Sequence, residues 1–135
     1  MPDPLYTARV TVRWGDQDAL GHVNNAAYLT YVEQARIEFL EHVGGGRWPG
    51  HPDGGPILAA VEVQFRRPVH YPSTVVVAVH GGEPGRTSFP LDSVLTVEGD
   101  EDTVVAEVKA TLVWVDRETG RPTPLPDALR TALAG

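Results

Sequence analysis

Two hydrophobic periods follow each other along the first third of this 135-residue chain. In residues 7–14, TARVTVRW, the apolar residues Val10, Val12 and Trp14 alternate with polar ones, which predicts a half-buried strand. The segment GDQDALGH that follows carries two Gly and two Asp, a composition typical of a loop. The apolar positions then recur at three- and four-residue steps, which predicts a helix over residues 25–43.

The predicted helix has apolar residues on more than one side. One face comprises Tyr28, Tyr31, Val32, Ala35, Phe39 and Val43, and the residues that project elsewhere are Leu29, Ile37 and Leu40. A helix of this kind is expected to be surrounded by the rest of the protein, with the aromatic residues of the first face in the core rather than in a ligand pocket. Asn24 or Asn25 can cap its start, and the glycines at 44–46 favour its end.

Four further runs rich in Val and Thr follow a Gly- and Pro-rich loop at residues 46–56. These runs cover residues 57–67, 74–82, 86–98 and 103–115. The sequences HYPS, GEPG and EGDED between them are typical of turns, so we expect four strands joined as an antiparallel meander. A last short helix is expected from Pro126.

The order of these elements predicts an α+β fold. A single helix with apolar residues on most sides is best accommodated if a five-stranded antiparallel sheet curls around it. A hydrophobic content of 41% and a charged content of 21% fit one globular domain over residues 1–135. Such a sheet leaves an edge and a face uncovered, which favours association with a second copy of the chain.

The composition excludes several classes of function. There is no cysteine, which removes disulfides and thiol nucleophiles, and the five histidines show no helical i, i+4 pair, so no metal site is expected. The formal net charge of −7 argues against binding to nucleic acids or anionic membranes, although a few arginines would suffice for a small anionic ligand. No apolar run approaches the ~20 residues of a membrane span. The N-terminus lacks the pattern of a signal peptide, so we expect a cytoplasmic protein.

The loop before the helix brings acidic residues to a helix N-terminus, where unpaired amides and a partial positive charge can polarise a carbonyl group. A carboxylate beside those amides can attack a carbonyl carbon or orient a water molecule. Asp18 is therefore a catalytic candidate, although an Asp before a helix is also a common cap. We interpret Asp16 as a loop-closing side chain, and His22 either steers a substrate or stabilises the loop.

The stretch VRWGDQDALGHVNNAAYLTYVEQAR resembles the N-terminal signature of the hotdog-fold acyl-CoA thioesterases of the 4-hydroxybenzoyl-CoA thioesterase type. In that family a D-x-D-x-x-G-[HIV]-V-x-N/Y loop precedes the central helix. The later segments FRRPVHYPSTVVV, GRTSFPLDSVLTV and VAEVKATLVWVDRETGRPTPLP are also similar to the family's remaining strands and terminal segment. The resemblance extends from about residue 7 to residue 127.

The resemblance implies a hotdog fold, a dimer or tetramer with sites at subunit interfaces, and hydrolysis of a coenzyme A thioester, with coenzyme A as part of the substrate and no further cofactor. The second Asp of the D-x-D pair, here Asp18, carries the chemistry in the family, and a backbone amide that falls at Asn25 polarises the thioester carbonyl. Arg86, before the Ser88–Phe89 step, matches a basic residue that contacts the nucleotide end of coenzyme A. We count Ser88 with it as a candidate for coenzyme A binding.

Three charged residues outside this loop have two interpretations each. Arg66 and Arg67, at the end of a predicted strand, either hold phosphates or form a plain surface pair, and Arg67 is our third candidate for coenzyme A binding. Glu33 lies within the helix, where related hotdog enzymes place their carboxylate. It faces away from Tyr28 and Phe39, so we expect it to be solvated or paired with a cation.

Two other functions stay open at the level of the sequence. A hotdog hydratase or dehydratase that acts on acyl thioesters pairs a His with a carboxylate across subunits, but this chain lacks the F-P-x-x-P context that follows in such dehydratases. A non-catalytic domain that binds acyl thioesters is the other alternative. The sequence also leaves open which acyl group is cleaved, and whether Asp18 acts as a nucleophile or as a general base.

Overall fold

The computed structural model describes residues 3–44 and 54–135. Its elements in chain order are β1 (Tyr6–Thr11), the 3₁₀-helix η1 (Trp14–Asp16), α1 (Asn25–Val43), β2 (Gly54–Phe65), β3 (Thr74–Gly81), β4 (Ser88–Val97), β5 (Ala106–Asp116) and α2 (Asp127–Leu133). No helix among these residues is long and apolar enough to cross a membrane.

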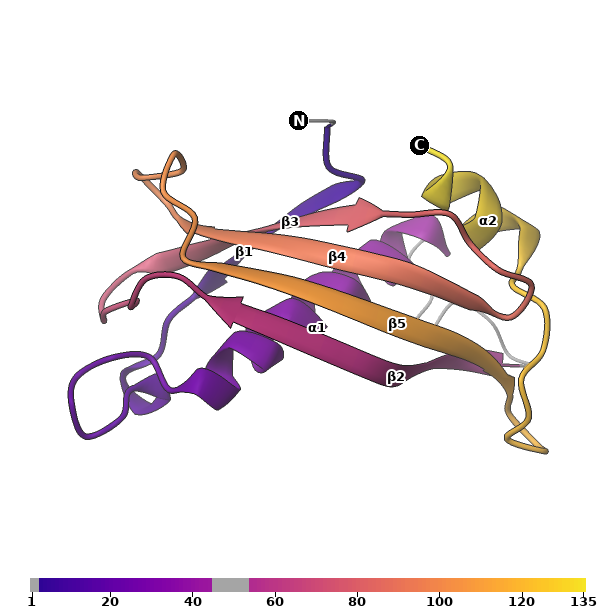
Figure 1. Ribbon diagram of the computed structural model, residues 1–135, viewed down its shortest axis with the longest axis horizontal. Helices are drawn as coiled ribbons and strands as arrows, with labels where there is room; N and C mark the ends of the chain where they lie inside the picture. Colours follow the sequence, from indigo (N-terminus) through magenta and orange to yellow (C-terminus); the bar gives the residue numbers. More distant parts are fainter. Residues whose placement is uncertain (1–2, 45–53) are drawn as a thin grey trace.

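The five strands form one antiparallel sheet in the order β1-β3-β4-β5-β2. Figure 1 shows α1 lying along one face of this curved sheet, with α2 near one end of α1. The predicted fold class, a five-stranded antiparallel sheet with one long helix packed on it, is confirmed.

The core lies between α1 and alternate residues of the strands, as the period of two residues requires. The strand residues buried in it include Val75, Val77, Val79, Phe89, Leu91, Leu95, Val108, Leu112 and Trp114. The predicted core residues Tyr28, Tyr31 and Phe39 are buried among them, at 3%, 2% and 2% exposure. Leu29 projects elsewhere, as predicted, but it stays 39% exposed, so the helix is not fully surrounded by its own chain.

The predicted meander is correct for β3, β4 and β5 and wrong for β2. The run expected at 57–67 pairs with β5 instead of β3, because the connection 66–73 crosses the end of the sheet and β3 pairs with β1. Buried Val69 lies in that connection and its carbonyl oxygen accepts a hydrogen bond from the Val23 amide, at 2.8 Å. β2 also begins earlier than expected, at Gly54, so the last three residues of the predicted loop 46–56 belong to a strand.

The helix prediction for residues 25–43 is confirmed, and the structure decides which asparagine caps it. The Asn24 side chain accepts a hydrogen bond from the Ala26 amide at 2.9 Å, so Asn24 is the N-cap. Gly44 is the C-cap, whereas the glycines at 45–46 lie outside the described residues. The last helix, α2, follows Pro126 as expected.

Trp14 does not belong to the first strand, contrary to the predicted alternation over 7–14. β1 ends at Thr11, and the Asp16 carboxylate then accepts a hydrogen bond from the Arg13 amide at 2.9 Å, which turns the chain into η1. The Trp14 side chain is 74% exposed as a result. A local side-chain hydrogen bond therefore overrides the hydrophobic alternation at this point.

Candidate active site

A small hairpin carries Asp18 and ends at the N-terminus of α1. The Asp18 amide donates to the His22 carbonyl oxygen at 2.7 Å, and Gln17 and Val23 form a β-bridge. Gly21 closes the turn with a φ of +80°, a conformation that side chains with a Cβ rarely adopt. The Asn24 amide donates to the Asp16 carbonyl oxygen at 2.8 Å, which ties the hairpin to the cap of the helix.

The Asp18 carboxylate is fixed within this hairpin through one of its two oxygens. Oδ1 accepts hydrogen bonds from the amides of Leu20, at 2.9 Å, and His22, at 3.2 Å. Oδ2 accepts none of the hydrogen bonds found in the described part of the chain, and the side chain is exposed. Asp18 therefore presents one oxygen in a defined orientation to whatever approaches the hairpin.

The first amide of α1 is left available by the cap. Asn24 accepts the Ala26 amide with its side chain and the Ala27 amide, at 2.9 Å, with its carbonyl oxygen. The Asn25 amide lies between Asn24 and Ala26 in the chain. It takes part in no hydrogen bond within residues 3–44 and 54–135. It sits at the positive end of the helix dipole, so it is suited to stabilise a developing negative charge on a ligand oxygen.

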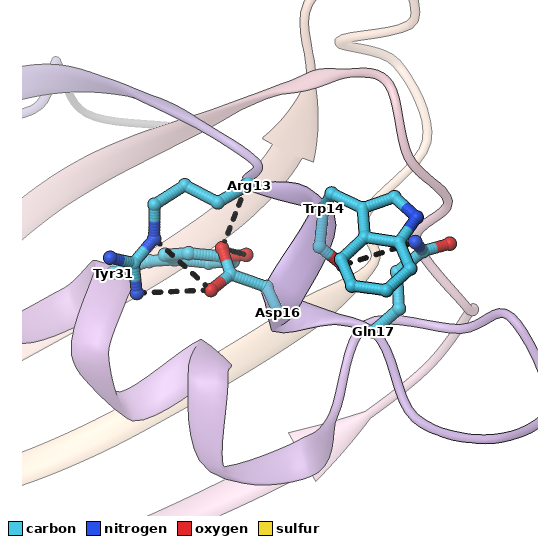
Figure 2. Close-up of polar contacts among 5 residues, drawn as sticks. All are labelled: Arg13, Trp14, Asp16, Gln17 and Tyr31. Carbon is cyan, nitrogen blue, oxygen red and sulfur yellow. Dashed lines mark hydrogen bonds and ion pairs between the residues drawn. The ribbon is translucent and has the colours of Figure 1, made fainter.

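Asp16 has the structural role that the sequence predicted. It is 8% exposed and accepts the Tyr31 hydroxyl at 2.7 Å, the Arg13 amide at 2.9 Å and the Arg13 guanidinium at 3.2 Å (Figure 2). Burial alone raises the pKa of Asp16, but these hydrogen bonds together outweigh it, so the pKa lies below its ordinary value. Burial, and then the bond to Asp16, raise the pKa of the Tyr31 phenol. The network anchors the start of the loop to the second turn of α1.

His22 has an aromatic neighbour that the sequence analysis did not identify. The rings of His22 and His70 lie edge to face, with centroids 5.2 Å apart. His70 comes from the connection 66–73 between β2 and β3, which crosses the end of the sheet beside the hairpin. No local sequence signal links the two residues, because the contact depends on the sheet order that the meander prediction missed.

The candidates for coenzyme A binding are divided between the two ends of the sheet. Arg67 lies near the Asp18 end and lines a hollow of about 440 Å³ together with Thr103 and Val104. Arg86 lies in the turn between β3 and β4, and Ser88 is the first residue of β4, at the opposite end of the strands (Figure 1). A single chain therefore does not bring Arg86 or Ser88 together with Asp18.

The two remaining charged candidates lie at the surface. Arg66 forms an ion pair with Glu107 at 2.7 Å, so its guanidinium has an anionic partner within its own chain. Glu33 is exposed on α1. Within residues 3–44 and 54–135, no three side chains of the kinds that bind metals lie close enough together to hold an ion.

Large apolar side chains are exposed beside the hairpin and along β2. Trp14 and Leu20 are 74% and 81% exposed, and Phe65 at the end of β2 is 48% exposed. β2 itself is an edge strand with Ile57 and Val61 exposed as well. Exposed apolar groups concentrated on one edge and one loop are typical of a surface that another molecule covers.

Comparison with known proteins gives a consistent family. The family model of the thioesterase-like superfamily matches residues 12–133. The long-chain acyl-CoA thioesterase FadM of Escherichia coli (strain K12) is 29% identical over 125 residues, which cover 93% of this chain and 94% of FadM.

Two solved structures share the fold closely. The PA2801 protein of Pseudomonas aeruginosa, described as a candidate thioesterase, superposes with a TM-score of 0.90 at 37% identity, over 97% of this chain and 99% of that one. A thioesterase of Thermus thermophilus, complexed with coenzyme A and zinc, superposes with a TM-score of 0.81 at 36% identity, over 98% and 95% of the two chains. The predicted hotdog fold is confirmed by these similarities.

Proposed function

Because this chain belongs to the thioesterase-like superfamily and is a thioester hydrolase, we propose that it cleaves the thioester of an acyl-CoA to the free acid and coenzyme A. The observation that supports this most directly is a carboxylate, Asp18, fixed in a hairpin whose base is tied to the cap of α1, where the Asn25 amide makes no hydrogen bond within the described residues. The narrower 4-hydroxybenzoyl-CoA thioesterase type is part of the same proposal.

The chemistry needs an attacking oxygen and a donor for the developing oxyanion. In the general-base route, Asp18 Oδ2 takes a proton from water while the water oxygen bonds to the thioester carbon. The carbonyl oxygen gains the electron pair and accepts the Asn25 N–H. The C–S bond then breaks, and the coenzyme A thiolate takes the proton back from Asp18.

Direct attack by Asp18 is the second route. Oδ2 bonds to the thioester carbon, the coenzyme A thiolate leaves, and water hydrolyses the resulting mixed anhydride. A single turnover in ¹⁸O-labelled water tests for direct attack, because the label enters the Asp18 carboxylate only on this route, when water attacks the Asp18 carbonyl carbon of the anhydride. Either route uses the same orientation of Asp18 and the same amide donor.

We further propose that the active site is completed by a second copy of the chain. If two copies pair through the free edge of β2, a two-fold axis makes their β2 strands antiparallel. Each end of one sheet then lies beside the opposite end of the other sheet. The end of the sheet that carries Arg86 and Ser88 in one copy then lies beside the end where the other copy carries Asp18. The same pairing covers the exposed apolar residues of β2.

The test of the proposed activity is a thiol-release assay on octanoyl-CoA, palmitoyl-CoA and benzoyl-CoA. We expect at least one to be hydrolysed, and Asp18→Asn to lower kcat by about 100-fold or more, as expected for loss of a base or nucleophile. Asparagine keeps an oxygen for the Leu20 and His22 amides, so the hairpin is retained.

Asp116→Asn is the matched control for this experiment. The Asp116 carboxylate accepts the amides of Glu118 and Thr119, both at 2.9 Å, in a turn at the end of β5, so it has the same local geometry without the helix N-terminus. We expect full activity in this variant. Full activity in Asp18→Asn contradicts the proposed role of Asp18. Hydration of an enoyl-CoA without release of thiol contradicts the hydrolase itself.

A further inference from the structure

The turn between β3 and β4 is held by other parts of the chain. Within the turn, the Gly85 amide donates to the Ser88 carbonyl oxygen at 2.8 Å. From β5, the Trp114 amide donates to the Thr87 carbonyl oxygen at 2.8 Å. From the C-terminal segment, the Leu125 amide donates to the carbonyl oxygen of Arg86 at 3.1 Å. Each backbone bond fixes a different residue of the turn.

The side chain of Arg130 adds a second hold on the same turn. Its Nη2 donates to the Gly85 carbonyl oxygen at 2.9 Å and to the Arg86 carbonyl oxygen at 3.3 Å. Arg130 lies on α2, and α2 is itself anchored because Leu129 and Leu133 are buried in the core. A guanidinium can bridge two neighbouring carbonyl groups because its donors form a fixed fork.

The side chain of Arg86 is left free by this arrangement. It is exposed, and in the described part of the chain its guanidinium makes no hydrogen bond or ion pair, whereas its carbonyl oxygen accepts two donors from the C-terminal segment. The backbone of this residue is therefore fixed, while its cation is exposed and has no partner among the described residues. That is the arrangement expected of a residue that is held ready for an external anion.

We propose that Arg130 is a positioning residue for substrate binding, which fixes the turn so that Arg86 meets the phosphates at the nucleotide end of coenzyme A. This inference rests on the proposed function. Arg130 acts on an interaction remote from the thioester carbon, so it stabilises the bound substrate and the transition state equally. Such a contact affects KM and leaves kcat unchanged.

The experiment measures kcat and KM of each variant with two substrates. One is the acyl-CoA that the enzyme hydrolyses fastest, and the other is the pantetheine thioester of the same acid, which lacks the nucleotide. We expect Arg130→Ala to raise KM for the acyl-CoA by roughly three- to tenfold. This is the effect expected if Arg86, no longer fixed, loses the equivalent of about one hydrogen bond to the substrate. We expect kcat and both constants for the pantetheine thioester to stay within about twofold of the wild type, because that substrate never reaches the turn.

Two further variants control for loss of structure. Arg130→Lys keeps a cation that can reach one carbonyl group, so it should restore part of the acyl-CoA affinity and remains informative if Arg130→Ala does not fold. Arg117→Ala removes an exposed arginine just after β5, whose guanidinium makes no hydrogen bond or ion pair in the described residues, and should behave as the wild type with both substrates.

The double variant Arg86→Ala/Arg130→Ala tests whether the two residues act through one contact. If Arg130 works through Arg86, the double variant has the same KM as Arg86→Ala alone, because coupled residues are not additive. Multiplied effects indicate an independent structural role and overturn the inference.

The remaining outcomes separate this inference from the function on which it rests. If Arg86→Ala raises KM for the acyl-CoA alone and Arg130→Ala does not, the inference fails and the proposed function stands. If Arg86→Ala leaves KM for both substrates unchanged, the role of Arg86 fails and the inference fails with it. If no thioester in the panel releases thiol, the proposed function itself has failed.

Discussion

Asp16 and Asp18 are two residues apart and have opposite environments. Asp16 is buried and satisfied by Arg13 and Tyr31, whereas Asp18 is exposed and keeps one oxygen free. The chain thus assigns one carboxylate to hold the loop and the other to face a ligand. This difference follows from which way each side chain points as the chain turns through η1 into the hairpin.

Replacing Asp16 by Asn is expected to destabilise the protein by about 1–3 kcal/mol near neutral pH, because a buried set of donors loses its charged acceptor. The pKa of Asp16 is depressed in the folded state, so the stability it contributes is present above the ordinary carboxyl value of 3.8 and is lost as the pH falls through the lower, folded-state pKa. Urea unfolding of the wild type and Asp16→Asn at about pH 7 and about pH 3 measures this.

We expect the difference between these two proteins to be larger at the higher pH and to shrink in acid. An equal difference at both values would show that Asp16 contributes through shape alone. Asp18→Asn serves as the control, since its exposed side chain should leave the unfolding free energy nearly unchanged at either pH.

The residues of the candidate site differ in how far the sequence could predict them. Asp18 and Asn25 are placed by a local motif next to a helix start: Asp18 accepts two amides of the hairpin, and Asn25 is the first residue of α1. His70 and Arg130 reach their partners from distant segments, so only the folded chain reveals them. Trp14 was misplaced because a hydrogen bond inside the loop is invisible to a hydrophobic pattern.

Among the elements, α1 was predicted most accurately. Its apolar period, its Asn cap and its terminal Gly all act within a few residues of one another, so the sequence alone contains the information. Strand pairing depends on contacts between segments far apart in the chain, which is why the position of β2 at the far edge of the sheet was missed. The ends of the strands shifted by a few residues for the same reason.

The N-terminus of α1 gives a prediction at the scale of an element. Asn24→Ala removes the acceptor of the Ala26 amide and should cost about 1 kcal/mol of stability. The same change loosens the first turn, so the Asn25 amide is less precisely placed and kcat for the acyl-CoA should fall. Thermal unfolding and steady-state kinetics measure the two effects.

Asn24→Ser is the rescue variant, because a serine hydroxyl also caps helices well. It should recover both stability and kcat. If Asn24→Ala lowers the melting temperature while kcat is unaffected, the first turn of α1 is not part of the catalytic apparatus.

At the scale of the whole molecule, the apolar edge at β2 and the separation of Asp18 from Arg86 lead to one expectation, a shared active site between two copies. Asp18→Asn and Arg86→Ala are each expected to be impaired at low substrate concentration. When equal amounts are unfolded together and refolded, mixed dimers contain one site with both changes and one with neither. Random pairing should then restore about one quarter of the wild-type activity.

If the activity of the refolded mixture equals only the mean of the activities of the two single variants, the shared site is contradicted. That result would mean that Asp18 and Arg86 of the same chain serve the same active site. Refolding of Asp18→Asn with wild type provides the reference for recovery of activity after refolding, because half of its sites are intact whether or not the chains exchange. Size-exclusion chromatography of each mixture shows whether the chains associate at all.

The placement of Asp18 and Arg86 at opposite ends of the sheet also has a kinetic consequence. A chain that separates from its partner keeps both Asp18 and Arg86. It still cannot place the two residues on the same substrate molecule. Under the proposed arrangement, the turnover rate per chain is therefore not constant: it falls steeply once the enzyme is diluted below the dissociation constant of the dimer, and it recovers on concentration.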